Sequence, residues 1–179
     1  LFVRVRDTQS LDDVTALATE VAAYKVDYVG LDLAFDGMAV ECASGEAATF
    51  RRCVETVRAV NHGNLILMSE DADLLEAGLE AALEVGQSVT PLLYAANANN
   101  WQEMAAVAKR NKMPLAVAGA TLDELAQLTG QISAAGVEDL VLAPSTVDFA
   151  GSLSLLTQLR RLALKYGKRE LGYPILTLP

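Results

Sequence analysis

The sequence contains too few cysteine and histidine residues to hold an iron–sulfur cluster or a typical zinc site. Cys42 and Cys53 form neither a CxxC pair nor a disulfide framework, and a [4Fe–4S] cluster needs about four thiolates. The one histidine, His62, stands in the turn sequence NHGN and belongs to no histidine–carboxylate cluster with metal spacing. We therefore expect no metal site in this segment, and we expect both cysteines to be small buried or half-buried hydrophobic residues.

Positive charge is also scarce. The 179 residues include 14 basic and 23 acidic side chains, which gives a formal net charge of −9 and a pI near 4.6. Nucleic acids and anionic membranes bind to basic faces, so this balance argues against both as partners. No apolar run approaches the roughly 18 residues of a membrane span, and no basic stretch followed by an apolar one indicates a secretory signal. The cytoplasm is the expected compartment.

What the sequence does have is an alternation of short apolar runs and longer stretches rich in Ala, Leu and Glu. The short runs are FVRV, MAVEC, LILM, PLLYA, PLAVA, LVLAP and YPILTL. They lack the in/out alternation of a half-exposed antiparallel sheet, which is typical of parallel strands covered on both faces. The longer stretches have helical spacing, for example over residues 122–128. The pattern predicts seven strands and six helices.

Several helix ends are marked in the sequence. A capping residue followed three positions later by an acid stands at 10–13, 100–103 and 121–124. Gly136 and Gly167 suit helix C-termini, where a left-handed residue is favoured.

Residues 27–43 (DYVGLDLAFDGMAVECA) are compatible with one long strand, or with a short extended pair before a strand at MAVEC. Gly37 after Asp36 is a turn signal, and it favours the second interpretation.

A parallel β/α series of this length forms either an open doubly wound sheet or a (β/α)8 barrel. The first strand is followed by RDTQS and not by a glycine-rich phosphate loop, which argues against an open nucleotide-binding sheet. A complete barrel has typically ~250 residues. We predict an α/β fold, a (β/α)8 TIM-type barrel truncated after about the seventh strand, with residues 1–179 as a single partial barrel domain. Because the chain begins at Leu1 and ends in the apolar run YPILTLP, we expect a segment of a longer polypeptide.

In such a barrel the active face consists of the loops that follow the strands. The polar residues expected there are Arg6, Asp7, Thr8, Glu41, Ser44, Ser69, Glu70, Asp71, Asn97, Asn99, Asn100, Thr121, Ser145, Thr146, Asp148 and Thr177. All five lysines lie in or beside predicted helices, so no Schiff-base chemistry is indicated. The run VAGA ends a strand without a polar group before Thr121. No catalytic residue is predicted.

Two charged clusters have structural explanations. Glu70, Asp71 and Asp73 resemble a carboxylate site, but acids in a first helical turn are also what the helix dipole favours. The basic run from Arg160 to Glu170 is compatible with a docking patch, and cations at a helix C-terminus are again expected on dipole grounds. The structural explanation is favoured for both clusters.

The stretch TPLLYAANANNW places three asparagines where an apolar run ends. Asn100 is explained as a helix cap, with Glu103 three residues later. Asn97 and Asn99 exceed what one cap requires, and a pair of amides suits the edge of a planar heterocycle. They are therefore the candidate ligand-binding or partner-binding residues, although asparagine is common in loops for local reasons.

Three consecutive blocks of the sequence resemble a known family. The blocks are PLLYAANANNWQEMAAVAKRNKMPLAV, TLDELAQLTGQISAAGVEDLVLAP and LTQLRRLALKYGKRELGYPILTLP. They are similar to the large (gamma) subunit of the corrinoid iron–sulfur protein, part of the carbon monoxide dehydrogenase/acetyl-CoA synthase system. The resemblance covers nearly the whole chain and is strongest from Asn64 onward.

The resemblance implies a barrel from its first to its seventh strand, taken from a protein with a separate [4Fe–4S] domain and a separate corrinoid-binding domain. The family carries a methyl group on cobalt from methyl-tetrahydropterin to acetyl-CoA synthase in the reductive acetyl-CoA pathway. The implied partners are the small subunit, as a heterodimer, a pterin methyltransferase and acetyl-CoA synthase. The barrel itself would be scaffold and docking surface.

The block VLAPS departs from VLDPG, which is common in the family, because Ala143 replaces a carboxylate and Ser145 a glycine. Related pterin-binding methyltransferase barrels hold the pterin with acids and amides at strand ends, and Asn97 matches one such amide by resemblance. A pterin-binding barrel with Asn97 and Asn99 in its site is therefore the second hypothesis. A barrel of aldolase or decarboxylase type is disfavoured by the missing lysine and histidine.

Overall fold

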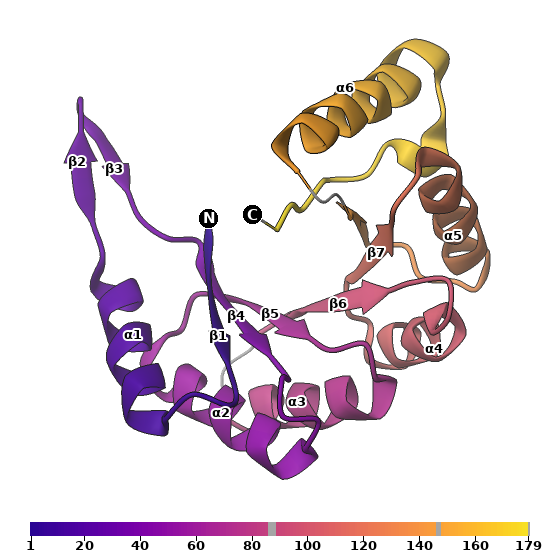
Figure 1. Ribbon diagram of the computed structural model, residues 1–179. Helices are drawn as coiled ribbons and strands as arrows, with labels where there is room; N and C mark the ends of the chain where they lie inside the picture. Colours follow the sequence, from indigo (N-terminus) through magenta and orange to yellow (C-terminus); the bar gives the residue numbers. More distant parts are fainter. Residues whose placement is uncertain (86–88, 146–147, 179) are drawn as a thin grey trace. The chain divides into compact units, whose positions relative to one another are not determined.

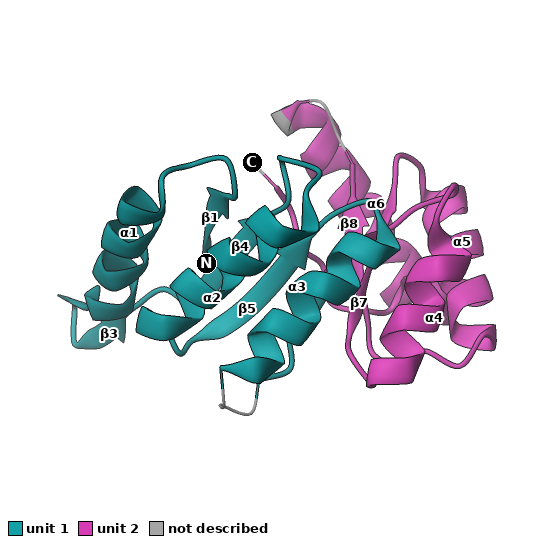
Figure 2. Ribbon diagram, turned by 90° about the horizontal axis from the view of Figure 1, so that it is seen from below, with its two compact units in different colours: residues 1–92 teal, residues 93–179 magenta. Residues whose placement is uncertain are grey.

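The structure is a computed structural model that describes residues 1–85, 89–145 and 148–178 (Figure 1). The chain divides into two compact units, residues 1–92 and residues 93–179 (Figure 2). Each unit is built from strands that alternate with helices.

The described residues of the first unit form three parallel strands, in the order β1-β4-β5, and three helices, together with a short pair of strands. Its elements are β1 (Phe2–Arg6), α1 (Leu11–Ala23), β2 (Val26–Tyr28), β3 (Leu31–Leu33), β4 (Gly37–Glu41), α2 (Ala47–Val60), β5 (Asn64–Met68) and α3 (Ala72–Glu84). In the sheet Val5 is paired with Val40, and Val40 with Leu67, and all three side chains are buried. β4 and β5 are therefore continuous buried strands, as the sequence pattern predicts, whereas β1 contributes only Val5 to the buried residues.

β2 and β3 form the short extended pair that the sequence favours, an antiparallel hairpin. The turn lies at Val29 and Gly30, both with positive φ, and the Asp27 carboxylate accepts a hydrogen bond from the Gly30 amide (3.0 Å). Gly37 was predicted to mark the turn, and this was wrong. Gly37 instead begins β4, where a Cβ atom would stand 1.9 Å from the Asn64 carbonyl oxygen. A close approach of two backbones, not a turn, requires glycine there.

The second unit has three parallel strands in the order β6-β7-β8. Its elements are β6 (Leu92–Ala96), α4 (Trp101–Asn111), β7 (Leu115–Gly119), α5 (Leu122–Ala134), β8 (Leu140–Pro144), α6 (Phe149–Tyr166) and the 3-10 helix η1 (Arg169–Leu171). The register of β6 shifts between Leu93 and Ala96, and the Tyr94–Ala95 peptide bond is cis. A core cluster joins α5, β8, α6 and η1 through Leu125, Leu142, Leu159 and Leu171.

The predicted seventh strand, YPILTL, is reduced to one parallel bridge between Ile175 and Leu142 in the described part of the chain. The Leu142 amide donates to the Pro174 carbonyl (2.7 Å), and the Leu176 amide donates to the Leu142 carbonyl (2.8 Å). The segment therefore follows the outer edge of β8 without continuing as a regular strand.

The helix ends follow the sequence signals with one exception. Ser10 and Thr121 cap their helices by accepting from the Asp13 and Glu124 amides, as predicted. Gly136 and Gly167 follow helices with positive φ. Asn100 occupies the N-cap position of α4 but makes no side-chain capping bond, so its predicted capping role was wrong. None of the helices in the described ranges has the length and apolar character to cross a membrane.

Candidate functional site

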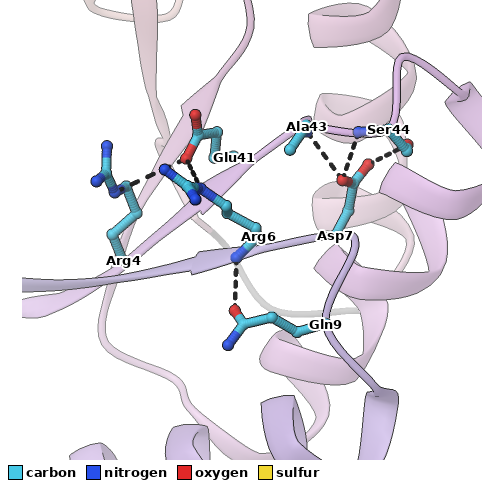
Figure 3. A network of polar contacts seen from close by, with 7 residues as sticks. All are labelled: Arg4, Arg6, Asp7, Gln9, Glu41, Ala43 and Ser44. Atoms are coloured by element: carbon cyan, nitrogen blue, oxygen red, sulfur yellow. Dashed lines mark hydrogen bonds and ion pairs between the residues drawn. The ribbon is translucent and has the colours of Figure 1, made fainter.

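In the first unit, polar residues gather where β1 and β4 end (Figure 3). The two strands are parallel and in register, so Arg6 lies beside Glu41 at the same edge of the sheet. The Asp7 amide continues the pairing by donating to the Glu41 carbonyl (3.0 Å). Arg6, Asp7, Glu41 and Ser44 were predicted to lie in loops on the same face, and they do meet at this edge.

Asp7 is the centre of this cluster, with 4% of the residue exposed. Its Oδ1 accepts hydrogen bonds from the Ala43 and Ser44 amides (2.8 Å each), and its Oδ2 accepts from the Ser44 hydroxyl (2.5 Å). A buried carboxylate is stabilised by such charge-assisted bonds. Because three donors already occupy it, the carboxylate fastens the loop after β4 to the loop after β1.

Arg4, Arg6 and Glu41 form the exposed side of the cluster. Glu41 Oε2 lies 2.9 Å from the Nε of Arg6 and 3.7 Å from the Nε of Arg4. Two guanidinium groups thus share one carboxylate, and the group carries one net positive charge. Gln9 Oε1 accepts from the Arg6 amide (2.8 Å). Arg4 and Gln9 were not predicted, although residues two apart on a strand face the same side, which was the available signal for Arg4.

The two cysteines lie near Asp7 and are protonated at neutral pH. Burial and the Asp7 charge together raise the pKa of the Cys42 thiol, and they raise the pKa of the fully buried Cys53 to about 11. A thiolate is the form that ligates metals or attacks substrates. The expectation of half-buried and buried apolar residues is confirmed for both cysteines.

The acids after β5 have a structural role. Asp71 is the N-cap of α3, and its Oδ1 accepts from the Asp73 and Leu74 amides at 2.9 and 3.2 Å. Ser69 Oγ accepts from the Asp71 amide (3.1 Å). His62 is exposed and precedes β5, at the opposite strand end from the active face. No group of three or more metal-ligating side chains occurs within the described ranges.

In the second unit, the asparagines after β6 form hydrogen bonds within their own turn. Asn97 Oδ1 accepts from the Asn99 backbone amide (2.9 Å), while Asn100 Oδ1 accepts from the Asn97 backbone amide (2.7 Å). The Asn100 Nδ2 donates to the Ala95 carbonyl (3.3 Å). The Asn100 side chain therefore closes the loop after β6 instead of capping α4, which is the physical reason for the failed capping prediction.

The strand ends next to this turn offer few polar groups. β7 ends at Gly119, and Ala143 of β8 is buried opposite Ala118. Thr121 and Asp148 cap α5 and α6. Ser145, Thr8 and Thr177 are exposed, and Thr146 lies outside the described residues. Asn97 is half-buried and Asn99 exposed, and the acids that follow along the chain include Glu103 in the first turn of α4 and, after β7, Glu124, whose Oε2 accepts from the Ala120 amide (2.9 Å).

Comparison with known proteins identifies the family. A family model described as the CO dehydrogenase/acetyl-CoA synthase delta subunit matches residues 1–179. The chain belongs to this family. The corrinoid/iron-sulfur protein large subunit of Moorella thermoacetica is 36% identical over 98% of the chain and 39% of its own length. The acetyl-CoA decarbonylase/synthase complex subunit gamma of Archaeoglobus fulgidus is 34% identical over 99% of the chain and 38% of its own length. The chain thus spans about two fifths of these relatives, and the predicted resemblance is confirmed.

Among solved structures, the chain is similar to dihydropteroate synthase from Thermus thermophilus, crystallised in complex with 6HMPPP. The TM-score is 0.67 at 18% sequence identity, over 98% of this chain and 70% of that one. At this identity the likeness shows the fold alone. The chain is therefore an α/β protein with part of a TIM-type barrel, as predicted.

Proposed function

We propose that this chain is the barrel segment of a corrinoid iron–sulfur methyl carrier. The complete protein would take a methyl group from methyl-tetrahydropterin and deliver it to acetyl-CoA synthase in the reductive acetyl-CoA pathway. The observation that carries this proposal is the 36% identity to the Moorella large subunit over 98% of the chain. Residues 1–179 would form one partial barrel domain that acts as scaffold and docking surface in the cytoplasm.

The cofactors of such a carrier would lie in other parts of the complete protein. The residues present do not fit a [4Fe–4S] cluster, since the only two thiols are separated in sequence, have raised pKa values and are buried or half-buried. The Asp7 carboxylate is occupied by three donors. The corrinoid and the cluster are therefore assigned to regions outside this segment. The proposed partners are the small subunit, a pterin methyltransferase and acetyl-CoA synthase, with no nucleic acid or membrane.

Reconstitution tests the assignment of cofactors. Purified residues 1–179 should bind neither iron nor cobalamin, whereas the full-length protein should acquire both. Iron analysis and the corrinoid absorbance band measure the two outcomes, and methyl transfer from methyl-tetrahydropterin to the full-length protein measures its function. Stoichiometric iron or a corrinoid band in the segment would contradict the assignment. A full-length protein that binds no corrinoid would contradict the proposed function.

A pterin-binding methyltransferase barrel is the second candidate, and the loop after β6 is the observation that favours it. The side-chain nitrogen of Asn97 and the side chain of Asn99 make no hydrogen bond within the described residues. They are thus available to a heterocycle edge or to a partner. Against a pterin site stand the missing acid at Ala143 and the apolar end of β7, which leave such a ligand with unpaired polar atoms.

Calorimetry distinguishes the two candidates. We expect methyl-tetrahydropterin to show no saturable binding to the segment at low-millimolar concentration, a binding free energy of roughly −4 kcal/mol or weaker. The double variant Asn97→Ala, Asn99→Ala is the matched control. A micromolar dissociation constant that this variant abolishes would make the methyltransferase the better hypothesis.

A further inference from the structure

The basic residues of the chain are concentrated near its C-terminal end. Residues 149–179 contain five basic residues and one acidic residue, a net charge of +4, while residues 1–148 contain nine basic and 22 acidic residues, a net charge of −13. The five cations are Arg160, Arg161, Lys165, Lys168 and Arg169, here called the basic segment. A positive region of this kind on an acidic chain requires an explanation.

The helix dipole accounts for only one of the five cations. Helix α6 ends at Tyr166, and Lys165 is the basic residue of its last turn. Arg160 and Arg161 precede that turn, and the other two cations follow the left-handed cap Gly167. The dipole effect falls off within the last turn. The structural explanation that the sequence favoured is therefore insufficient for four of the five residues.

The basic segment forms no ion pairs within the described residues, although Glu170 adjoins Arg169 in the sequence. All five residues are exposed, and none makes an ion pair there. Arg51 shows the contrast, because its guanidinium lies 3.0 Å from Glu80 and 2.8 Å from Glu84. Cations that are paired within a chain are less available to another molecule, whereas the five cations of the basic segment are exposed and form no ion pair within the described residues.

The segment also contains an exposed aromatic side chain that two of its cations approach. The Arg161 guanidinium and the Lys165 ammonium lie 6.0 and 5.9 Å from the centre of the Tyr166 ring, so both cations approach one aromatic side chain. Tyr166 is 57% exposed, and Leu164, two residues earlier on a different side of the same helix, is 77% exposed. Arginine and tyrosine around an apolar contact are enriched where proteins bind proteins.

We propose that the basic segment is a docking surface for an acidic surface of another protein chain. Charge complementarity identifies the partner, since five cations without an ion pair favour carboxylates, and the exposed Tyr166 beside Arg161 and Lys165 favours an additional apolar contact. An extended polyanion such as a nucleic acid or an anionic bilayer would meet the strongly acidic remainder of the chain. The proposal deepens, and rests on, the proposed role of the chain in docking partner subunits.

Binding of a defined peptide tests the surface. The probe is a synthetic peptide in which glutamates flank leucines, measured against residues 1–179 at low ionic strength. We expect binding that weakens as salt is added, because exposed charge pairs are screened. Phosphatidylserine vesicles and a single-stranded oligonucleotide are the comparison ligands, and both should bind more weakly than the peptide.

Two double variants with equal net charge locate the binding. Arg161→Glu with Lys165→Glu should weaken peptide binding at least about tenfold, because like charges then oppose each other. Arg52→Glu with Lys112→Glu changes two cations elsewhere and should alter it less than about twofold. The neutral double variant Arg161→Gln, Lys165→Gln should give an intermediate loss of peptide binding. It takes the place of Arg161→Glu, Lys165→Glu if the charge-reversed protein does not fold.

Three results would overturn the proposal. They are the absence of peptide binding, an equal loss in the control variant, and tighter binding of the vesicles or the oligonucleotide. The proposed methyl-carrier function is tested separately, by measuring the corrinoid content of the full-length protein. A full-length Arg161→Glu, Lys165→Glu variant should keep its corrinoid, so the two ideas fail independently.

Discussion

In residues 1–92 the loops after β1 and β4 are joined through the buried Asp7 carboxylate, whereas in residues 93–179 the loop after β6 is closed by its own amides. The Asp7 bonds connect residues 36 and 37 positions apart, while the asparagine bonds span two to five. The first unit has six basic and 16 acidic residues, a net charge of −10, and the second has eight and seven, a net charge of +1.

This contrast indicates that polar residues have different roles in the two β/α units. In the first unit, polar groups at the strand ends serve mainly to hold consecutive loops together. In the second unit, polar groups at the strand ends bond within their own loop or cap the next helix, and the exposed cations without an ion pair in the described residues include those of α6 and η1. Substitutions at the strand ends should therefore affect stability in the first unit far more than in the second.

The largest effect is expected from Asp7→Ala. This variant leaves the Ala43 and Ser44 amides and the Ser44 hydroxyl without their acceptor, so the free energy of unfolding should fall by about 3 kcal/mol. Chemical denaturation measures the change. Asp12→Ala, which removes the same charge from an exposed helical turn, should cost less than about 1 kcal/mol. Equal losses in the two variants would show that Asp7 has no special role.

Hydrogen exchange on the same variant tests whether residues 1–179 are one domain. In a single cooperative domain, the slowest amides of β7 should lose as much protection as those of β4. Loss confined to the first unit would mean that the two units unfold separately, and it would contradict the proposal of one partial barrel domain.

Alkaline pH should also destabilise the first unit. Cys53 has a pKa of about 11 when folded, against an ordinary value of 9.0, so the unfolded chain loses its proton first as the pH rises. The stabilisation is complete below pH 9 and is lost as the pH rises from 9 to 11, by about 2–3 kcal/mol at 1.36 kcal/mol per pH unit. The second unit has no cysteine.

The unfolding free energy measured between pH 8 and pH 11 checks this dependence. Tyrosine and lysine titrate in the same range, so the informative quantity is the difference from Cys53→Ala. The variant should show a shallower loss with pH than the parent protein. Parallel curves for the two proteins would contradict the role of Cys53.

The smallest effect is expected at the asparagines. Asn97→Ala with Asn99→Ala removes one bond from the turn, the one that Asn97 Oδ1 accepts, and it should change the unfolding free energy by less than about 1 kcal/mol. The same denaturation experiment measures it. A loss as large as that of Asp7→Ala would remove the contrast between the two units.

The helices and most strands could be predicted from the sequence because local signals and tertiary packing favour the same structure. The apolar runs of β4 and β5 became buried strands, β1 buries Val5, and Ser10 and Thr121 capped helices where the spacing required it. The turn at Val29 was not accessible, because a β-branched residue with positive φ contradicts local preference. The role of Gly37 depends on Asn64, which is distant in sequence.

The sequence predicted which residues lie at the candidate site, but not which hydrogen bonds they form with one another. Asp7 and Ser44 were both candidates, yet nothing local indicates that the carboxylate would accept the Ser44 hydroxyl across 37 positions. Asn100 was predicted to cap α4 because asparagine commonly caps helices at this position. Its Oδ1 instead accepts a hydrogen bond from the Asn97 backbone amide. Whether the Asn100 side-chain oxygen accepts from the loop amide or from a helix amide depends on the backbone geometry, which cannot be read from the sequence.

The segment that follows η1 has a consequence for solubility. A strand with a free edge is a template for pairing with another chain, and proteins protect such edges with short or proline-containing segments. The bonds from Leu142 to Pro174 and from Leu176 to Leu142 occupy part of the outer edge of β8. Pro174 has no amide hydrogen to offer a further strand. The segment around Pro174 therefore covers part of an edge that could otherwise pair with another chain, and shortening the chain before residue 174 would expose the backbone of β8 at Leu142.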